Sequence, residues 1–289
     1  MRHASDHLTV NGIQLCLHRF RDEAAPSSGL TLLLLHGFLD AGTSWDEVAA
    51  PLAAAGHEVL APDLRGFGRS GWVGAGGYYH FSDYVADVTA LVDKLSPERL
   101  GVVAHSMGGS IAVYYAGTFP ARVERLALLE GLGPVHNDPD LAVSRMEAWL
   151  RDLKRVDRTP RPLGSLEDAV ARLAAHHPRV AREVLARRAA QLTRVDAEGR
   201  RTWAYDPLHR TIAPTPFSGT GFMAFLRRIT CPTLLVSGGP QGWQVPDAEA
   251  RAACLQKVQR FDLPEAGHMM HWTEPEPLAA RLVTFFGGA

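Results

Sequence analysis

Short runs of apolar residues recur along the chain and predict a series of β-strands. Residues 8–10 and 13–20 have strand-like patterns and flank Asn11-Gly12, the strongest short signal for a β-hairpin. Residues 30–35 form a continuous apolar run, as expected for a strand buried on both faces. Five further runs have the length and composition of strands: residues 58–61, 100–103, 123–129, 233–237 and 258–263.

Segments with apolar residues at helical spacing separate these strands. They comprise residues 45–55, 81–95, 111–116 and 273–286. Alternating strands and helices predict an α/β fold, with a mostly parallel twisted sheet and helices on both faces.

The alternation stops after residue 131 and resumes near residue 226. The intervening sequence is mostly helical in pattern, with a capping-box signal at Ser165 to Asp168 and a hairpin turn at Glu198-Gly199. We therefore expect an α/β core formed by residues 1–131 and 226–289, and an inserted helical lid formed by residues 132–225.

Composition narrows the classes of partner. The 289 residues are 46% hydrophobic, enough for a large core. The net charge of −1 predicts no attraction to nucleic acid or an anionic membrane, so a small-molecule partner is expected. Three widely spaced cysteines predict neither a disulfide framework nor a metal site, and with no apolar signal segment they indicate a soluble, cytoplasmic protein. The oligomeric state is left open.

Ser106 lies at an abrupt junction between a strand and a helix. Ala104, Gly108 and Gly109 keep side-chain bulk away from the turn, which is the pattern of a nucleophile elbow. A small-residue turn in another doubly wound fold is the alternative. In an elbow, the Ser106 hydroxyl lies at a helix N-terminus, where free N–H groups and the helix dipole favour negative charge.

A serine nucleophile needs a base within hydrogen-bond reach, and the base needs an orienting acid. His268 is the best candidate base, because it follows the last strand and the flexible Gly267, where a loop can bring it over the elbow. His271 is the competitor, and its alternative role is a packing residue at the start of the closing helix.

The same chemistry requires two N–H donors for the developing oxyanion. Met107, directly after the nucleophile, supplies one, and the loop after residues 30–35 supplies the other, from Phe38 or alternatively Leu39. His36 is expected to be buried and to steady this loop. His105 is expected to point away from the nucleophile and pack against its neighbours.

The motifs in this chain resemble those of the α/β-hydrolase fold family with a helical cap. They are His36-Gly37-Phe38, Asp63-Leu-Arg-Gly-Phe-Gly-Arg-Ser70, Ala104-His-Ser-Met-Gly-Gly109 and Gly267-His268. The resemblance covers essentially the whole chain and implies the chain order serine, acid, histidine. More narrowly, the chain resembles serine hydrolase-like proteins at Tyr79-His80-Phe81, Asp83-Tyr84, residues 129–134 and Asp206-Pro207.

The acid departs from the usual pattern of this family. Relatives carry an Asp a few residues after the strand equivalent to residues 233–237, but Gln241 stands about there. An amide cannot stabilise an imidazolium by charge. Glu130, at the end of the preceding strand, is the candidate, because certain haloalkane dehalogenases and other members take their acid from this position. Asp247 is the alternative acid, although it resembles a helix N-cap.

These expectations favour a cofactor-free serine hydrolase without a metal, acting on carboxylic esters, lactones or thioesters through an acyl-enzyme. Hydrolysis of a C–C bond is a variant of the same chemistry. A hydrolase-like binding protein with weak turnover is the alternative class, and the missing Asp near Gln241 is its support. Haloalkane dehalogenase and epoxide hydrolase activities are disfavoured, because those members use Asp where this chain has Ser106.

The expected lid would determine specificity. Between residues 151 and 210 there are 14 Lys or Arg against 8 Asp or Glu, which indicates either an anionic substrate or a solvated basic face. Several aromatic residues could line an apolar pocket: Trp149, Trp203, Tyr205, Phe217, Phe222, Phe225 and Trp243.

Overall fold

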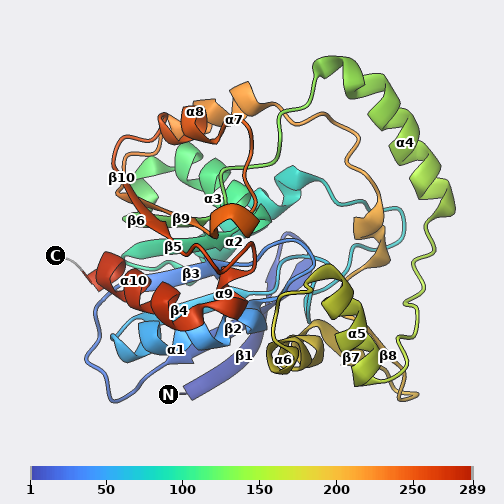
Figure 1. Ribbon diagram of the computed structural model, residues 1–289, viewed down its shortest axis with the longest axis horizontal. Coiled ribbons are helices and arrows are strands. Elements are labelled where there is room, and N and C mark those ends of the chain that lie inside the picture. Colours follow the sequence, from blue (N-terminus) through green and yellow to red (C-terminus); the bar gives the residue numbers. More distant parts are fainter. Residues whose placement is uncertain (1, 288–289) are drawn as a thin grey trace.

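Eight strands form one sheet in the computed structural model, which describes residues 2–287 (Figure 1). The spatial order is β1-β2-β4-β3-β5-β6-β9-β10, and all neighbours from β4 to β10 are parallel. The strands are β1 (Arg2–Val10), β2 (Ile13–Arg21), β3 (Thr31–Leu35), β4 (Glu58–Pro62), β5 (Leu100–His105), β6 (Arg125–Leu129), β9 (Thr233–Ser237) and β10 (Val258–Asp262). The predicted α/β class is confirmed.

Helices cover both faces of this sheet. Leu32 and Leu34 of β3 belong to an apolar cluster with α1 (Asp46–Ala54) and α10 (Pro275–Gly287). Leu33 and Leu35 point to the other face, where the cluster includes α2 (Phe81–Leu95), α3 (Met107–Thr118) and α7 (Gly219–Leu226). The continuous apolar run of β3 is thus required because both of its faces are buried.

Two elements differ from their predicted bounds. β1 begins at Arg2 and pairs with β2 over its whole length, but most of its side chains are exposed, so its pattern carries little apolar signal. The predicted closing helix, residues 273–286, corresponds to α10, which begins at Pro275, and the separate short helix α9 (Met270–Thr273) precedes it. Proline suits the first position of a helix, where its missing N–H is not needed. Short elements complete the chain: α8 (Ala248–Ala252), η1 (Gly42–Trp45), η2 (Pro120–Arg122), η3 (Pro139–Leu141), η4 (Pro207–Arg210) and η5 (Gly239–Gln241).

The segment between β6 and α7, here called the insertion (residues 132–218), supplies no strand to the eight-stranded sheet. It contains α4 (Ala142–Arg155), α5 (Leu166–His176), α6 (Arg182–Leu192) and a separate hairpin of β7 (Thr193–Val195) and β8 (Arg201–Trp203). Ser165 and Asp168 form the predicted capping box of α5. In Figure 1, α4 stands apart at the upper right, and α5 and α6 lie beside the C-terminal helices.

The boundary of the insertion lies earlier than residue 225. Phe222 and Leu226 of α7 are completely buried in the core cluster that contains α3. Gly117 of α3 lies against the backbone of Phe225, where a Cβ atom would meet the Phe225 carbonyl oxygen at 2.6 Å. We therefore assign α7 to the α/β core.

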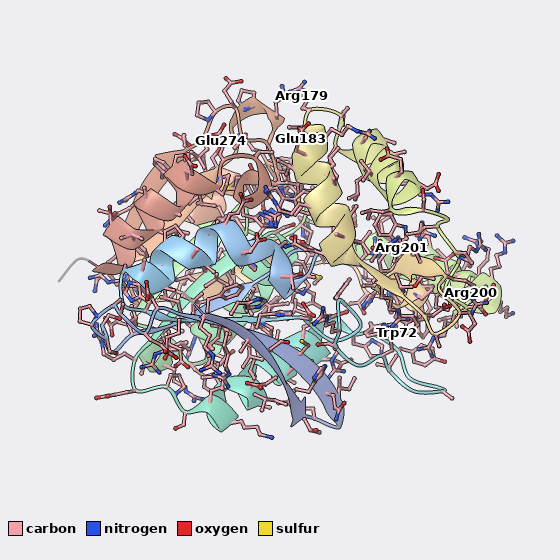
Figure 2. The ribbon with its side chains drawn as sticks, turned by 90° about the horizontal axis from the view of Figure 1, so that it is seen from below. Trp72, Arg179, Glu183, Arg200, Arg201 and Glu274 are labelled. Carbon is pink, nitrogen blue, oxygen red and sulfur yellow. The ribbon has the colours of Figure 1, made fainter. Side chains whose placement is uncertain are left out.

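Polar contacts fasten the insertion to the core at two places. Arg188 of α6 is buried and contacts Asp46 and Glu47 of α1, at 2.7 and 2.9 Å. Asp206 of the insertion accepts a hydrogen bond from Tyr79 of the core at 3.0 Å, and it also pairs with Arg158 of the insertion at 2.5 Å. The β7–β8 hairpin also lies beside the loop that carries Trp72, as Figure 2 shows. Among residues 2–287, no helix is long and apolar enough to cross a membrane.

Candidate active site

Ser106 occupies the turn between β5 and α3 in a conformation that L-residues rarely adopt. Its backbone angles are φ 52° and ψ −115°, and its N–H donates to the carbonyl oxygen of Leu129 at 3.0 Å. A Cβ at position 108 would collide with the carbonyl oxygen of Leu35, and one at position 109 with the backbone of Gly131. The two glycines therefore let the helix begin directly against the neighbouring loops, and the strained turn presents the Ser106 hydroxyl.

His268 lies between Ser106 and Glu130. Its Nε2 is 3.1 Å from the Ser106 Oγ, and its Nδ1 is 2.5 Å from Glu130 Oε2. The Glu130 side chain is 3% exposed and that of His268 is 33% exposed. The chain thus brings together a hydroxyl, an imidazole and a carboxylate in the order needed to activate the hydroxyl.

The carboxylate of Glu130 is held by the loop after β9. Gly238 N donates to Oε1 at 2.8 Å, and Trp243 N donates to Oε2 at 2.5 Å. A Cβ on Gly242 would collide with Oε1, and one on Gly238 would meet it at 2.9 Å. The glycines in this loop therefore make the space into which Glu130 extends, and the two N–H groups compensate for its desolvation.

The alternative groups considered from the sequence have other partners. Asp247 is the N-cap residue of α8, and its carboxylate pairs with Arg251 at 2.9 Å. His271 is completely buried and contacts Asp40, not Ser106. Gln241 lies in the loop that holds Glu130, between Gly238 and Trp243, and its side chain forms no hydrogen bond within residues 2–287.

The loop after β3 carries the expected oxyanion donors. Within residues 2–287, the N–H groups of Phe38, Leu39 and Met107 have no hydrogen-bond partner. His36 is buried beneath the loop and donates from Nδ1 to the Gly37 carbonyl at 2.7 Å, while its Nε2 accepts the N–H of Leu64 at 2.9 Å. Burial lowers the pKa of His36, in agreement with a neutral ring that both donates and accepts.

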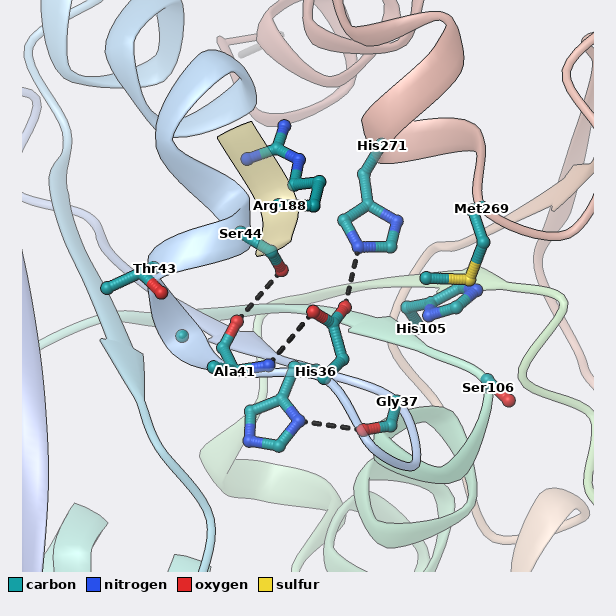
Figure 3. Close-up of polar contacts among 12 residues, drawn as sticks. His36, Gly37, Ala41, Thr43, Ser44, His105, Ser106, Arg188, Met269 and His271 are labelled. Atoms are coloured by element: carbon teal, nitrogen blue, oxygen red, sulfur yellow. Dashed lines mark hydrogen bonds and ion pairs between the residues drawn. The ribbon is translucent and has the colours of Figure 1, made fainter. Parts of the chain in front are cut away.

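Among residues 2–287, two buried clusters each place three potential metal ligands within 4.8 Å of one another. They are Cys16, His18 and Asp63, and Asp40, His105 and His271. In the first, Asp63 accepts hydrogen bonds from the N–H groups of Gly42 and Arg69, both at 2.7 Å. In the second, Asp40 is already bonded to His271 and to the N–H of Ala41, as Figure 3 shows. Hydrogen bonds within the protein account for both arrangements.

His268 lines one cavity, and another cavity lies within the insertion. The first, of about 690 Å³, is lined by His268, Gln241 and Trp243 from the core and by residues of α6 and the turn before it. The cavity within the insertion has a volume of about 360 Å³ and is lined by Trp203 and Tyr205, by the carboxylates of Asp152 and Asp157, and by Arg155, Arg161, Arg172 and Arg210. None of these four guanidinium groups forms a hydrogen bond or ion pair within residues 2–287.

Residues 31–275 match the α/β hydrolase fold family, and the chain belongs to this family. It is accordingly a hydrolase of the α/β fold. A 3-hydroxybutyrate-oligomer hydrolase from Cupriavidus necator is 29% identical over 285 residues, which cover 94% of each protein. A serine hydrolase-like protein from Danio rerio is 31% identical over 132 residues, which cover 46% of this chain and 40% of that protein.

Solved structures resemble the whole chain. A hypothetical protein from Pseudomonas aeruginosa has a TM-score of 0.84 and 28% identity, covering 98% of this chain and 99% of the other. A thioesterase domain from the curacin biosynthetic pathway has a TM-score of 0.82 and 27% identity, with the same coverage.

Proposed function

We propose that the protein is a serine hydrolase that cleaves carboxylic esters through an acyl-enzyme. The contact of His268 with both the Ser106 hydroxyl and the Glu130 carboxylate carries this proposal. The binding-protein alternative depends on the missing Asp near Gln241, and the contact between Glu130 and His268 supports the enzyme instead.

In this mechanism the Ser106 Oγ attacks the acyl carbon while His268 Nε2 takes its proton. Glu130 stabilises the imidazolium that forms and keeps its Nδ1–H directed away from the serine. The oxyanion accepts hydrogen bonds from the N–H groups of Met107 and Phe38. His268 then gives its proton to the leaving alcohol, and the acyl group stays on Ser106.

Deacylation repeats these steps with water. His268 takes a proton from a water molecule, the resulting hydroxide attacks the acyl carbon, and the second oxyanion uses the same N–H donors. Collapse of this intermediate releases the carboxylic acid, and the proton on His268 returns to the Ser106 oxygen. The cycle needs no cofactor.

The relatives support an ester or thioester as substrate. The name of the Cupriavidus necator relative specifies oligomers of 3-hydroxybutyrate, and the curacin domain is named a thioesterase. Both names describe cleavage of an acyl bond, which is the reaction that an acyl-enzyme on Ser106 would perform. We propose that the insertion forms the lid over this site and determines which acyl group enters.

The test is turnover of p-nitrophenyl esters of increasing acyl length. We expect a burst of p-nitrophenol equal to the enzyme concentration wherever deacylation is slower than acylation. Thioesters, lactones and a diketone measured beside the esters distinguish the bond that is cleaved. Folded protein that hydrolyses none of the esters, lactones or thioesters would contradict the proposal.

The arginines of the smaller cavity lead to a prediction about substrate charge. We expect p-nitrophenyl monoesters of dicarboxylic acids to be better substrates than neutral esters of equal length, by about five- to tenfold in kcat/KM at the best length. The preference should disappear in about 1 M salt, where the Debye length is about 3 Å. The Arg172→Gln/Arg210→Gln variant should lose it.

Arg151→Gln is the matched control, because Arg151 is an exposed arginine of α4 that does not line the cavity. It removes the same kind of charge from the same part of the protein. Equal loss of preference in this variant, or no preference at any acyl length, would mean that the basic residues form only a solvated face.

A further inference from the structure

Behind His268 lies a buried pair of histidines that the proposed mechanism does not use. His105 and His271 are completely or almost completely buried, at 1% and 0% exposure. The His105 ring lies 4.6 Å from the His268 ring and 4.6 Å from the His271 ring, measured between centroids. His105 immediately precedes Ser106 but its side chain extends away from the hydroxyl, as Figure 3 shows. It therefore occupies the space between the candidate base and the core.

His105 contacts the main chain of His268. Its Nε2 is 2.7 Å from the His268 carbonyl oxygen. A carbonyl oxygen can only accept, so Nε2 carries the proton and His105 is the donor. Burial lowers the pKa of His105 well below its ordinary value, in agreement with a neutral ring protonated at Nε2 alone.

His271 continues the cluster to the oxyanion loop. Its Nε2 lies 2.9 Å from Asp40 Oδ2, and Asp40 Oδ1 accepts the N–H of Ala41 at 2.9 Å. Burial raises the pKa of Asp40, but the hydrogen bond and charge of His271 outweigh it and bring the pKa to about 2. Asp40 is therefore an anion at the end of the loop that begins at His36.

The oxyanion loop also packs directly against His105. A Cβ on Gly37 would meet His105 Nδ1 at 2.8 Å and the Ser106 Cβ at 3.2 Å. Asp40 N donates to the Gly37 carbonyl at 3.4 Å, which closes the turn between these two residues. The His105 ring therefore lies against Gly37 of the oxyanion loop, and Asp40 closes the turn of the same loop.

We propose that His105, supported by His271 and Asp40, is a positioning residue that fixes the main chain of His268 and couples the base to the oxyanion loop. The proposal rests on the proposed role of His268. Glu130 orients the imidazole from its Nδ1, but His268 follows Gly267, which adopts the left-handed region at φ 67° and, having no side chain, restricts the backbone less than any other residue. The hydrogen bond from His105 holds the main-chain carbonyl group of His268 in place.

The effect should appear in the chemical step. Displacement of a reacting group by about 1 Å can cost about 100-fold in rate. The ester itself makes no contact with His105 in this arrangement, because the ring is buried behind His268. Loss of the bond should therefore lower kcat and the rate of the acylation burst, while KM changes little.

Glutamine and asparagine at position 105 provide a matched pair of variants. The amide nitrogen of Gln extends about as far as Nε2, whereas that of Asn extends only as far as Nδ1. We expect His105→Asn to lower kcat about 10- to 100-fold with KM nearly unchanged, and His105→Gln to keep most of the wild-type kcat. Equal kcat in both variants, or a loss confined to KM, would overturn the proposal.

His57→Asn controls for the general cost of replacing a buried histidine. His57 is 3% exposed and bonds Ser28, on another side of the fold. If this variant loses as much kcat as His105→Asn, the effect is structural and the proposal is wrong. Rates are expressed per active site titrated with a fluorophosphonate, so that unfolded protein is not counted.

The coupling to the oxyanion loop has its own test. If His105 and Asp40 act as one unit, the loss in the His105→Asn/Asp40→Asn variant should be smaller than the product of the two single losses. Independent, multiplicative losses would overturn the coupling.

Nitrogen chemical shifts of the histidine rings give a readout without any substrate. At pH 7 His105 should be neutral with its proton on Nε2. A proton on Nδ1 alone, or a cationic ring, would overturn the proposal. This measurement needs no ester, so it tests the role of His105 independently of the proposed function. The proposed function fails if the wild-type protein forms no acyl-enzyme.

Discussion

Ser106→Ala should lose about 10⁶-fold in kcat on any ester that the wild-type protein hydrolyses, as loss of a serine nucleophile does in a serine protease. The alanine removes the only atom that can carry the acyl group, while the backbone of the elbow and the N–H donors stay in place. No burst of p-nitrophenol should be seen. Fluorophosphonate labelling, mapped by mass spectrometry, should find Ser106 in the wild-type protein and no adduct in the variant.

Ser110→Ala is the matched control for this experiment. Ser110 lies one turn further along α3, is 3% exposed, and bonds through its backbone to Ser106. Its replacement should leave both labelling and kcat within a few-fold of wild type, because its hydroxyl is enclosed in the core. A label on another residue of the folded wild-type protein would remove Ser106 from its proposed role.

The sheet and the elbow could be predicted from sequence because both depend on local signals. A strand buried on both faces must be apolar throughout, as β3 is, and a strand-to-helix turn this tight requires the glycines after Ser106. The edge strand β1 lacks such a signal. It has few buried side chains, so its length is set by pairing with β2 and not by its own pattern.

The end of the insertion and the buried histidine cluster depend on long-range packing. α7 has the same helical pattern as α4, α5 and α6 of the insertion, and its contact with α3 is what assigns it to the core. The sequence predicts that His105 packs against its neighbours, and it leaves His271 as either a competing base or a packing residue; the burial of both is compatible with packing. Their contacts with the His268 carbonyl and with Asp40 join segments more than 160 residues apart, and no local pattern specifies such pairs.

Glu130 is the proposed acid, and Glu130→Gln should lower kcat about 10²- to 10⁴-fold, since the corresponding change in a serine protease triad costs about 10⁴-fold. The carboxylate accepts from Gly238 N and Trp243 N as well as from His268. An amide has one accepting oxygen, so at least one of these N–H donors must face an NH₂ group. The variant should therefore also lose about 1–3 kcal/mol of stability in denaturant titration.

The orientation of the new amide decides the size of the kinetic effect. If its NH₂ group faces His268, Nδ1 must accept, and the proton of the neutral ring lies on Nε2, which can then no longer take the proton of Ser106. If its oxygen faces His268, the tautomer is retained but the imidazolium loses its counter-charge. Both cases reduce kcat, and KM should change much less because the ester does not contact Glu130.

Variants of the two other candidates separate this account from its alternatives. Gln241→Ala should cost less than about tenfold, because its amide contributes at most one hydrogen bond of about 1 kcal/mol. Asp247→Asn should weaken the pair with Arg251 and leave kcat near wild type. Near wild-type activity in Glu130→Gln together with an inactive Asp247→Asn would identify Asp247 as the acid instead.

A second substitution can test whether the position of the charge matters more than the residue that supplies it. Gln241 lines the same cavity as His268, and its loop is where the resemblance to the family implies an acid. In the Glu130→Gln background, Gln241→Asp should therefore restore part of the lost kcat without restoring the stability, because the Gly238 and Trp243 donors would still face an amide. Recovery of both together would indicate that Glu130 acts by holding the loop, whereas recovery of kcat alone identifies its charge as the contribution to catalysis.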